Sequence, residues 1–284
     1  MSRVAIKGSA YCLEHVPQLG LHYGNTPYTA GEGEKEYLQA LPKHLQTYEQ
    51  AKGYAPNMTY IGALPLEDLD AQPTPMYENC NLEAPHFGKY GEIMPEDEFL
   101  GLLDICDVFD LIWLEKDFAA SVREKLSKHE LITESILARL EAGHDRAEIE
   151  EHLKSGDHTQ VLPLYFDGKV VGMARAAHTV DDNLFAHVLL ENLASKAGSV
   201  LALLHLLHNT GLKPEEVDFV IECSEEGAGD ACQRAGGNFA KAIAEIAGCV
   251  NASGCDVRGF CAGPVNAMIN GASQVAAGAR KNVV

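Results

Sequence analysis

Strand-like and helix-like segments alternate in the last part of the sequence. Residues 217–221 and 256–260 read as short strands, and residues 282–284 open a third one. Apolar side chains at helical spacing fill the intervals 238–248 and 263–279. The order β-α-β-α-β implies a parallel sheet with right-handed crossovers, which predicts an α/β fold with a central helix buried on most sides.

The third of these strands is short. A strand in the core of a parallel sheet normally runs on for several apolar residues, whereas Asn282-Val283-Val284 closes the sequence. We therefore expect this polypeptide to be one part of a longer protein and to be inactive by itself.

A hairpin and a long helix precede the alternating region. Residues 161–166 and 169–173 flank Asp167-Gly168, a dipeptide that favours the positive φ angles of a tight hairpin turn. Residues 184–208 carry a helical stripe of valine and leucine, which Gly211 is expected to cap.

The earlier residues are less regular, and we divide the chain into residues 1–95, 96–157 and 158–284. The first part is rich in Gly, Pro, Tyr and Asn and predicts an irregular wrapping segment, with short strands at 4–6 and 60–62 and a helix over 36–51 that breaks at Pro42. The second part predicts a helical insertion, in which Ile112 and Trp113 lie on a helix. The third part is the α/β region.

Charge and cysteine usage exclude several classes of protein. Lys and Arg number 22 against 41 Asp and Glu, a net charge of −19, which argues against nucleic acids and anionic membranes as partners. The eight cysteines include no Cys-x-x-Cys pair, so zinc-ribbon and thioredoxin sites are not expected, and we predict neither a metal nor a cofactor. The first residues lack an apolar signal region, which favours a reducing cytoplasm.

Cys261 is the strongest candidate for chemistry. It stands where a strand passes into a helix, Gly263 gives room for the turn, and Pro264 suits the first helical turn. A thiol at a helix N-terminus experiences the positive end of the helix dipole, which favours the nucleophilic thiolate. The alternative is that Cys261 is a small side chain of the core.

Other candidates are weaker. Cys223 follows the strand at 217–221, at the edge where parallel sheets place their sites, and Arg234 is placed to neutralise an anionic ligand. Gly263 is expected to line the same site. His205 and His208 are three residues apart and so have the spacing of a metal pair, but we expect core or boundary histidines.

Several segments resemble a known family. The block 184–284 resembles the first half of a thiolase-like or ketoacyl-synthase-like fold, with GLKPEEVDFVI at 211–221 and DVRGFCAG at 256–263 as the most telling runs. IKGSAYCL at 6–13 and GGNFAKAI at 236–243 are more specifically similar to the beta subunit of component C of the glycine/sarcosine/betaine reductase complex. The likeness spans the chain and reaches the N-terminal portion of a longer family member.

The resemblance implies acyl-group handling by an acyltransferase subunit. Component C takes an acetyl group from the selenoether on selenoprotein A and, with its alpha subunit, releases it to phosphate as acetyl phosphate. Cys261 matches the acyl-accepting cysteine of the superfamily. The superfamily's histidine or asparagine partners come from its second half, so no general base is assigned here.

Two alternative functions stay open. One is a condensing enzyme of the ketoacyl-synthase-III type, which would join acyl thioesters through a carbon–carbon bond. The other is a non-catalytic assembly subunit, in which the helical insertion and the acidic surface dock other subunits and Cys261 only packs. We also expect that half of a sheet-and-helix layer, taken by itself, exposes apolar surface, which favours association between copies of the chain.

Overall fold

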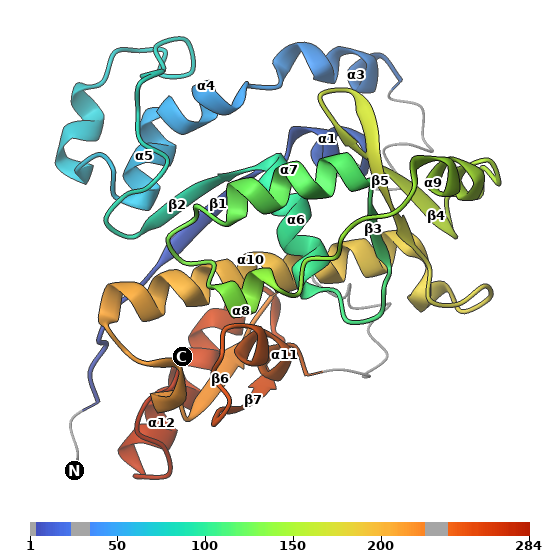
Figure 1. Cartoon of the computed structure of the whole chain (residues 1–284). Coiled ribbons are helices and arrows are strands. Elements are labelled where there is room, and N and C mark those ends of the chain that lie inside the picture. The colour runs from blue at the N-terminus through green and yellow to red at the C-terminus, as the bar shows by residue number, and fades with distance from the viewer. Residues whose placement is uncertain (1–3, 24–34, 225–237) are drawn as a thin grey trace.

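The structure is a computed structural model that describes residues 4–23, 35–224 and 238–284 (Figure 1). Its strands pair within small sheets, and parallel and antiparallel pairs both occur. They are β1 (Tyr11–His15), β2 (Gly91–Pro95), β3 (Ile112–Leu114), β4 (Val161–Phe166), β5 (Lys169–Arg175), β6 (Phe219–Glu222) and β7 (Ser253–Asp256).

Helices surround and connect these sheets. The α-helices are α1 (Pro17–Tyr23), α3 (Lys35–Ala40), α4 (Tyr48–Gly53), α5 (Ala55–Ile61), α6 (Glu96–Cys106), α7 (Lys116–Leu126), α8 (Glu134–Leu137), α9 (Arg146–Leu153), α10 (Ala186–Thr210), α11 (Phe239–Ile246) and α12 (Gly263–Ala276). The 3₁₀ helices are η1 (Leu41–His44), η2 (Leu66–Ala71), η3 (Asp182–Leu184), η4 (Pro214–Glu216) and η5 (Phe260–Ala262). Together they make a mixed α/β structure. No helix in the described ranges is long and apolar enough to span a bilayer.

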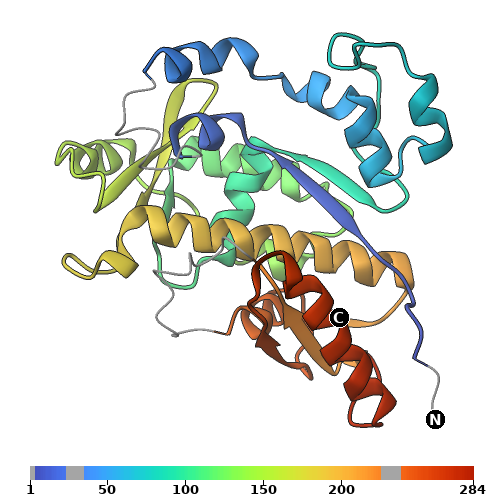
Figure 2. The same ribbon diagram turned by 180° about the vertical axis from the view of Figure 1, so that it is seen from behind.

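Helix α10 crosses the middle of the molecule and is the element on which the rest packs (Figures 1 and 2). Its 25 residues bury one broad face that includes Val200, Leu201 and Leu204. Helix α6 and strand β1 lie on one side of it, and α11 lies on the other. Gly211 ends the helix with a φ of 63°, as its sequence position predicts.

The C-terminal region confirms the predicted β-α-β-α-β order. Strands β6 and β7 pair in parallel, with Phe219 opposite Ser253. The last residues pair on the other side of β6 through a parallel bridge between Phe219 and Val283, supported by a 2.9 Å hydrogen bond from the Val284 amide to the Phe219 carbonyl. Strand β6 is therefore central, with α11 and α12 as the two connecting helices.

Two predictions about this region are wrong in detail. Strand β7 ends at Asp256 instead of beginning there, because the Asp256 carboxylate turns aside to accept hydrogen bonds from the Phe239 and Ala240 amides at the start of α11. Helix α12 is not buried on most sides: only Gly263 and Gly271 are buried along it. It rests on the sheet through Gly271, which faces Ile221 and Val283, whereas Met268 is 63% exposed.

The N-terminal region also differs from the predicted elements. Residues 4–6 form no strand; the strand that does form is β1, which pairs in parallel with β2. Residues 60–61 end helix α5, which stops where Gly62 adopts a φ of 79°. The helix predicted over 36–51 is split into α3, η1 and α4, with Pro42 in the first turn of η1 and Thr47 capping α4.

The middle of the chain is helical except at one place. Ile112 and Trp113 lie in strand β3, which pairs antiparallel with β5, so their assignment to a helix is wrong. The Asp107 carboxylate accepts hydrogen bonds from the Phe109 and Ile112 amides and thereby redirects the chain after α6. The predicted hairpin between β4 and β5 is confirmed, with Asp167 and Gly168 at positive φ.

Candidate functional site

Cys261 lies in the turn that connects β7 to α12, and its side chain is exposed. The chain leaves the sheet after Val257, whose amide donates to the Glu222 carbonyl at 2.8 Å. Phe260, immediately before the cysteine, has a φ of 49°, in the left-handed region that non-glycine residues avoid at a cost of about 1–2 kcal/mol. The turn therefore holds a strained residue directly beside the thiol, a feature that is frequent at functional sites.

Cys223 and Gly263 are brought together at this same end of the sheet. Cys223 follows the last residue of β6, and a Cβ atom added to Gly263 would lie 2.8 Å from the Cys223 sulfur. Helix α12 thus approaches Cys223 so closely that any larger residue at its first position would force the Cys223 side chain or the helix to shift. Cys261, two residues earlier, precedes the same helix end.

A cavity of about 350 Å³ lies beside Cys223. Glu222 and Ser224 line it together with Ser199 of α10 and residues 8–10. Ile243 of α11 and Val284 also contribute to the lining, so the cavity is built from segments that are distant in the sequence. Glu222, Cys223 and Ser224 in this lining stand at the carboxyl end of β6, where parallel sheets place ligands.

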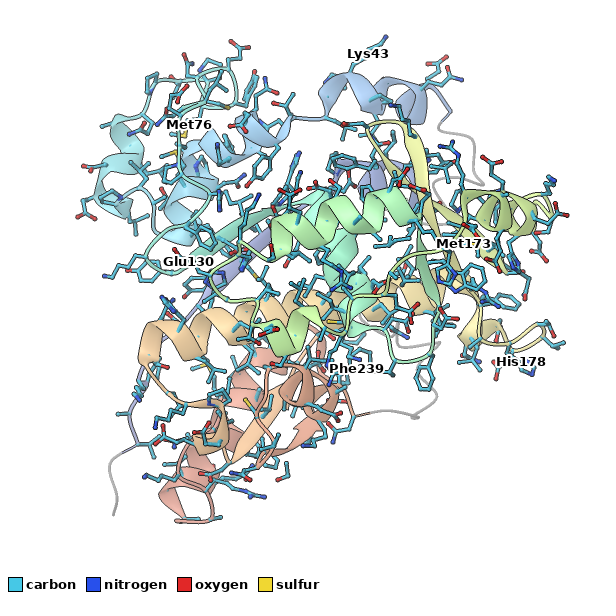
Figure 3. All side chains as sticks on the ribbon, viewed as in Figure 1. Lys43, Met76, Glu130, Met173, His178 and Phe239 are labelled. Carbon is cyan, nitrogen blue, oxygen red and sulfur yellow. The ribbon has the colours of Figure 1, made fainter. Side chains whose placement is uncertain are left out.

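An ion pair links the ends of the two strands. Arg258 Nη1 lies 2.5 Å from Glu222 Oε2 and 3.4 Å from both the carbonyl and the hydroxyl oxygen of Ser224. The guanidinium also lies 5.9 Å from the ring centroid of Phe239. Phe239 stands at the start of α11 (Figure 3). Because the Glu222 side chain is only 5% exposed, this pair fixes the base of the Cys261 turn from the β6 side. The sequence did not predict the Glu222–Arg258 ion pair, although both residues stand in or beside predicted strands.

Two other cysteines are excluded as nucleophiles by their surroundings. Burial raises the pKa of the Cys106 thiol to about 12 and that of Cys249 to about 11. Both side chains have no exposed surface. Both thiols therefore remain protonated at neutral pH, which argues against a nucleophilic role for either of them.

The remaining candidates lie elsewhere. Arg234 falls in the interval 225–237, outside the described residues. His208 is exposed, whereas His205 is buried and its Nε2 lies 2.9 Å from Glu92 Oε2. His205 therefore contacts a carboxylate in the interior, whereas His208, one helical turn later, faces solvent.

That carboxylate belongs to a buried cluster that the sequence did not reveal. His129 Nε2 also lies 2.9 Å from Glu92 Oε2, so one oxygen faces two imidazoles. Burial opposes the charge on Glu92, but its hydrogen bonds with His129 and His205 hold its pKa below the usual value. Burial likewise opposes charge on His129, yet the hydrogen bond to Glu92 raises the pKa of that imidazole. The cluster thus links three parts of the chain: β2, which carries Glu92; the segment that follows α7, which carries His129; and α10, which carries His205.

Comparison with known proteins supports the resemblance seen in the sequence. No protein-family model matches this chain, and no solved structure matches it significantly. The curated "Glycine/sarcosine/betaine reductase complex component C subunit beta" of Peptoclostridium acidaminophilum is 46% identical over 288 residues, which cover 100% of this chain and 55% of that protein. Along its whole length the chain is thus similar to a component C beta subunit, of which it spans about half.

Proposed function

We propose that this chain is the acyl-transfer part of a component C beta subunit in a glycine, sarcosine or betaine reductase complex. The observation that carries the proposal is the exposed Cys261 thiol in a strained turn at the start of α12. The similarity of the whole chain to a component C beta subunit supports the assignment to that complex. A cytoplasmic setting suits it, because reducing conditions keep a reactive thiol available.

The proposed chemistry is a thioester relay. We take the acetyl group to be joined to the selenium of selenoprotein A through its carbonyl carbon, as a selenoester, and the Cys261 thiolate attacks that carbon. The carbon–sulfur bond forms, the carbon–selenium bond breaks, and the electron pair leaves with the selenolate. Phosphate then attacks the acetyl-Cys261 carbonyl, which yields acetyl phosphate and returns the thiolate. The first amides of α12 supply partial positive charge for the oxyanion in both steps.

Other subunits complete the proposed system. The alpha subunit of component C is the expected partner in the phosphate step, and selenoprotein A presents the acyl group. The described residues near Cys261 include the Glu222–Arg258 pair, which positions the turn. We assign no general base, because no described histidine has been placed at this turn.

A labelling experiment on the assembled complex tests the proposal. The complex is incubated with a radiolabelled acetyl donor, quenched in acid and digested, and the labelled peptide is identified by mass spectrometry. We expect the label on Cys261, its release by hydroxylamine as for a thioester, and its loss in Cys261→Ser. The matched control Cys223→Ser should keep the label. Label on another residue, or none, would contradict the proposal, and a new carbon–carbon bond with a malonyl donor would instead indicate a condensing enzyme.

A non-catalytic assembly role is the second candidate, and one observation favours it. Phe260, Val265, Met268 and Ile269 are each between 57% and 69% exposed on and beside α12, an apolar surface suited to another subunit or another copy of the chain. Met268→Asp should leave folding intact, since that side chain is mostly exposed, but should weaken co-purification with the alpha subunit. If Cys261→Ala keeps full complex activity while Met268→Asp abolishes it, the assembly role is the correct one.

A further inference from the structure

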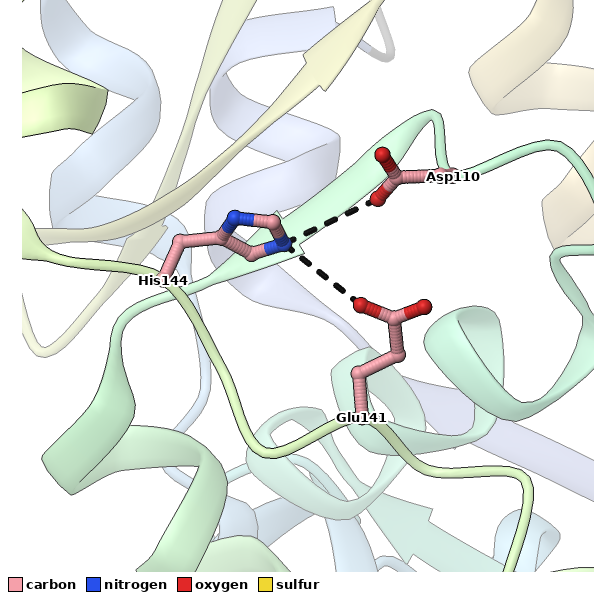
Figure 4. Close-up of side chains that lie close together, drawn as sticks. All are labelled: Asp110, Glu141 and His144. Atoms are coloured by element: carbon pink, nitrogen blue, oxygen red, sulfur yellow. Dashed lines mark ion pairs between the residues drawn. The ribbon is translucent and has the colours of Figure 1, made fainter.

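Three side chains of types that can bind a metal ion meet near the start of β3, apart from the cysteine turn. Asp110 lies just before β3, and Glu141 and His144 lie between α8 and α9 (Figure 4). His144 Nε2 is 3.7 Å from Asp110 Oδ1 and 3.5 Å from Glu141 Oε2. One ligand atom from each residue falls within 4.8 Å of the other two.

The imidazole of His144 is held in a fixed orientation. Its ring stacks on the Trp113 ring at 4.0 Å with an interplanar angle of 5°. The His144 amide donates to the Leu114 carbonyl at 2.8 Å, and the Lys116 amide donates to the His144 carbonyl at 3.1 Å. Among the described residues its Nε2 atom has no hydrogen-bond partner, although that atom is buried. An orphaned ring nitrogen in this position is costly unless something binds it.

The two carboxylates are also held by their backbones. Asp110 adopts a φ of 55°, and its carbonyl accepts the indole hydrogen bond of Trp113 at 3.2 Å. The Glu141 amide donates to Asp104 Oδ1 at 2.9 Å. Arg123 holds the chain just before Glu141 by donating to the Leu137 carbonyl at 3.1 Å. Both carboxylate side chains remain about half exposed, which leaves the cluster open to an ion from solvent.

The separations in this cluster fit coordination better than hydrogen bonding. N–H···O hydrogen bonds span about 2.7–3.2 Å, shorter than the 3.5 and 3.7 Å found here. Zinc binds imidazole nitrogen at about 2.0–2.1 Å and carboxylate oxygen at about 2.0–2.2 Å, so two ligands at a tetrahedral angle lie about 3.4 Å apart. A small divalent cation between the three atoms would satisfy the orphaned Nε2 and offset both negative charges.

We propose that Asp110, Glu141 and His144 form a divalent-cation site, with Zn²⁺ as the best-fitting ion and a water molecule as its fourth ligand. One nitrogen and two oxygens are a donor set that zinc accepts. The bound ion would join the turn before β3 to the segment between α8 and α9. This site is independent of the proposed acyl transfer at Cys261.

The only tryptophan of the chain gives a local signal for the test, because Trp113 stacks on the ligand His144. The purified full chain is freed of metal with a chelator and titrated with ZnCl₂, and tryptophan emission and binding heat are recorded together. We expect a saturable change in emission that EDTA reverses. Asp110→Asn and Glu141→Gln, which keep size and shape, should each weaken the affinity by about tenfold or more.

A second histidine beside the same tryptophan supplies the matched control. His152 meets the Trp113 ring edge-on at 5.2 Å but is not part of the cluster, so His152→Gln should keep the wild-type affinity. Co²⁺ in place of Zn²⁺ should give the visible absorption of tetrahedral cobalt. Zinc binding without any change in Trp113 emission would overturn the proposal, because it would place the ion elsewhere, for example on cysteines. An affinity that survives in both carboxylate variants would overturn it as well.

Discussion

At the scale of single residues, the close approach of α12 to β6 depends on the absence of a side chain at position 263. A Cβ atom at position 263 would lie only 2.8 Å from the Cys223 sulfur. This contact brings the segment after β6, which carries Cys223, against the start of α12, which Cys261 precedes. A change of one methyl group there acts on the position of the Cys261 turn without touching Cys261 itself.

Gly263→Ala is therefore expected to displace the start of α12. The added methyl group overpacks the contact with Cys223, which costs about 1–3 kcal/mol in the free energy of unfolding. Denaturant unfolding measures that loss. The double variant Gly263→Ala with Cys223→Ala removes the clashing sulfur and should recover most of it. If Gly263→Ala is as stable as the wild type, the contact is looser than the structure has it.

Single positions also mark where the sequence was informative. Asp167-Gly168 and Gly211 were each assigned to the turn or cap that they form, because such roles depend on the residue's own backbone preferences. Glu92 could not be placed from the sequence. Its partners His129 and His205 are 37 and 113 residues away, so only the folded chain brings the three together.

At the scale of elements, the Glu92 carboxylate of β2 contacts both His129, in the segment that follows α7, and His205 of α10, and so links these three elements. Both shifts favour the charged pair: the pKa of Glu92 is lowered and that of His129 is raised. A lowered acid pKa contributes stability that is lost as pH falls through the folded-state pKa, below the ordinary 4.5. A raised histidine pKa contributes stability that is lost as pH rises through the folded-state pKa, above the ordinary 6.5.

Glu92→Gln should therefore destabilise the protein most between those two limits. We expect a loss of about 1–3 kcal/mol near pH 6, because the buried imidazoles lose a charged acceptor. The difference between wild type and variant should shrink toward high pH, where His129 is neutral in both. Urea unfolding of the two proteins across the pH range measures it. A difference that does not change with pH would show that the cluster is uncharged when folded.

Elements were predictable where a short-range pattern decided them. The hairpin, α10 and the β-α-β-α-β order follow from turn residues and periodicity. Strand β3 did not, since Ile112 and Trp113 continue a helical spacing in the sequence and become a strand only by pairing with β5, some sixty residues later. The exposure of α12 was also unpredictable, because an uncharged helix is compatible with a buried place or with a face that awaits a partner.

At the scale of the whole molecule, one buried cluster of apolar side chains joins parts that the sequence separates. It contains Leu100 and Leu103 of α6, Leu201 of α10 and Ile243 of α11. Strand β3, from the middle of the chain, pairs with β5, which lies beyond the boundary predicted at residue 157. The division into three parts remains a prediction, and the shared core gives a way to test it.

Two buried thiols on opposite sides of α10 report on that core. Cys106 ends α6 and Cys249 follows α11, and neither has exposed surface. If the core is one cooperative unit, both thiols become reactive toward iodoacetamide over the same range of urea, together with the change in Trp113 emission. Leu201→Ala leaves a cavity at the shared centre, costs about 2–5 kcal/mol, and should shift all three midpoints by the same amount. Pulsed alkylation followed by peptide mass spectrometry measures each thiol separately. Should Cys249 become reactive at lower urea than Cys106, the C-terminal sheet would unfold by itself, and the chain would consist of units that α10 connects without coupling them.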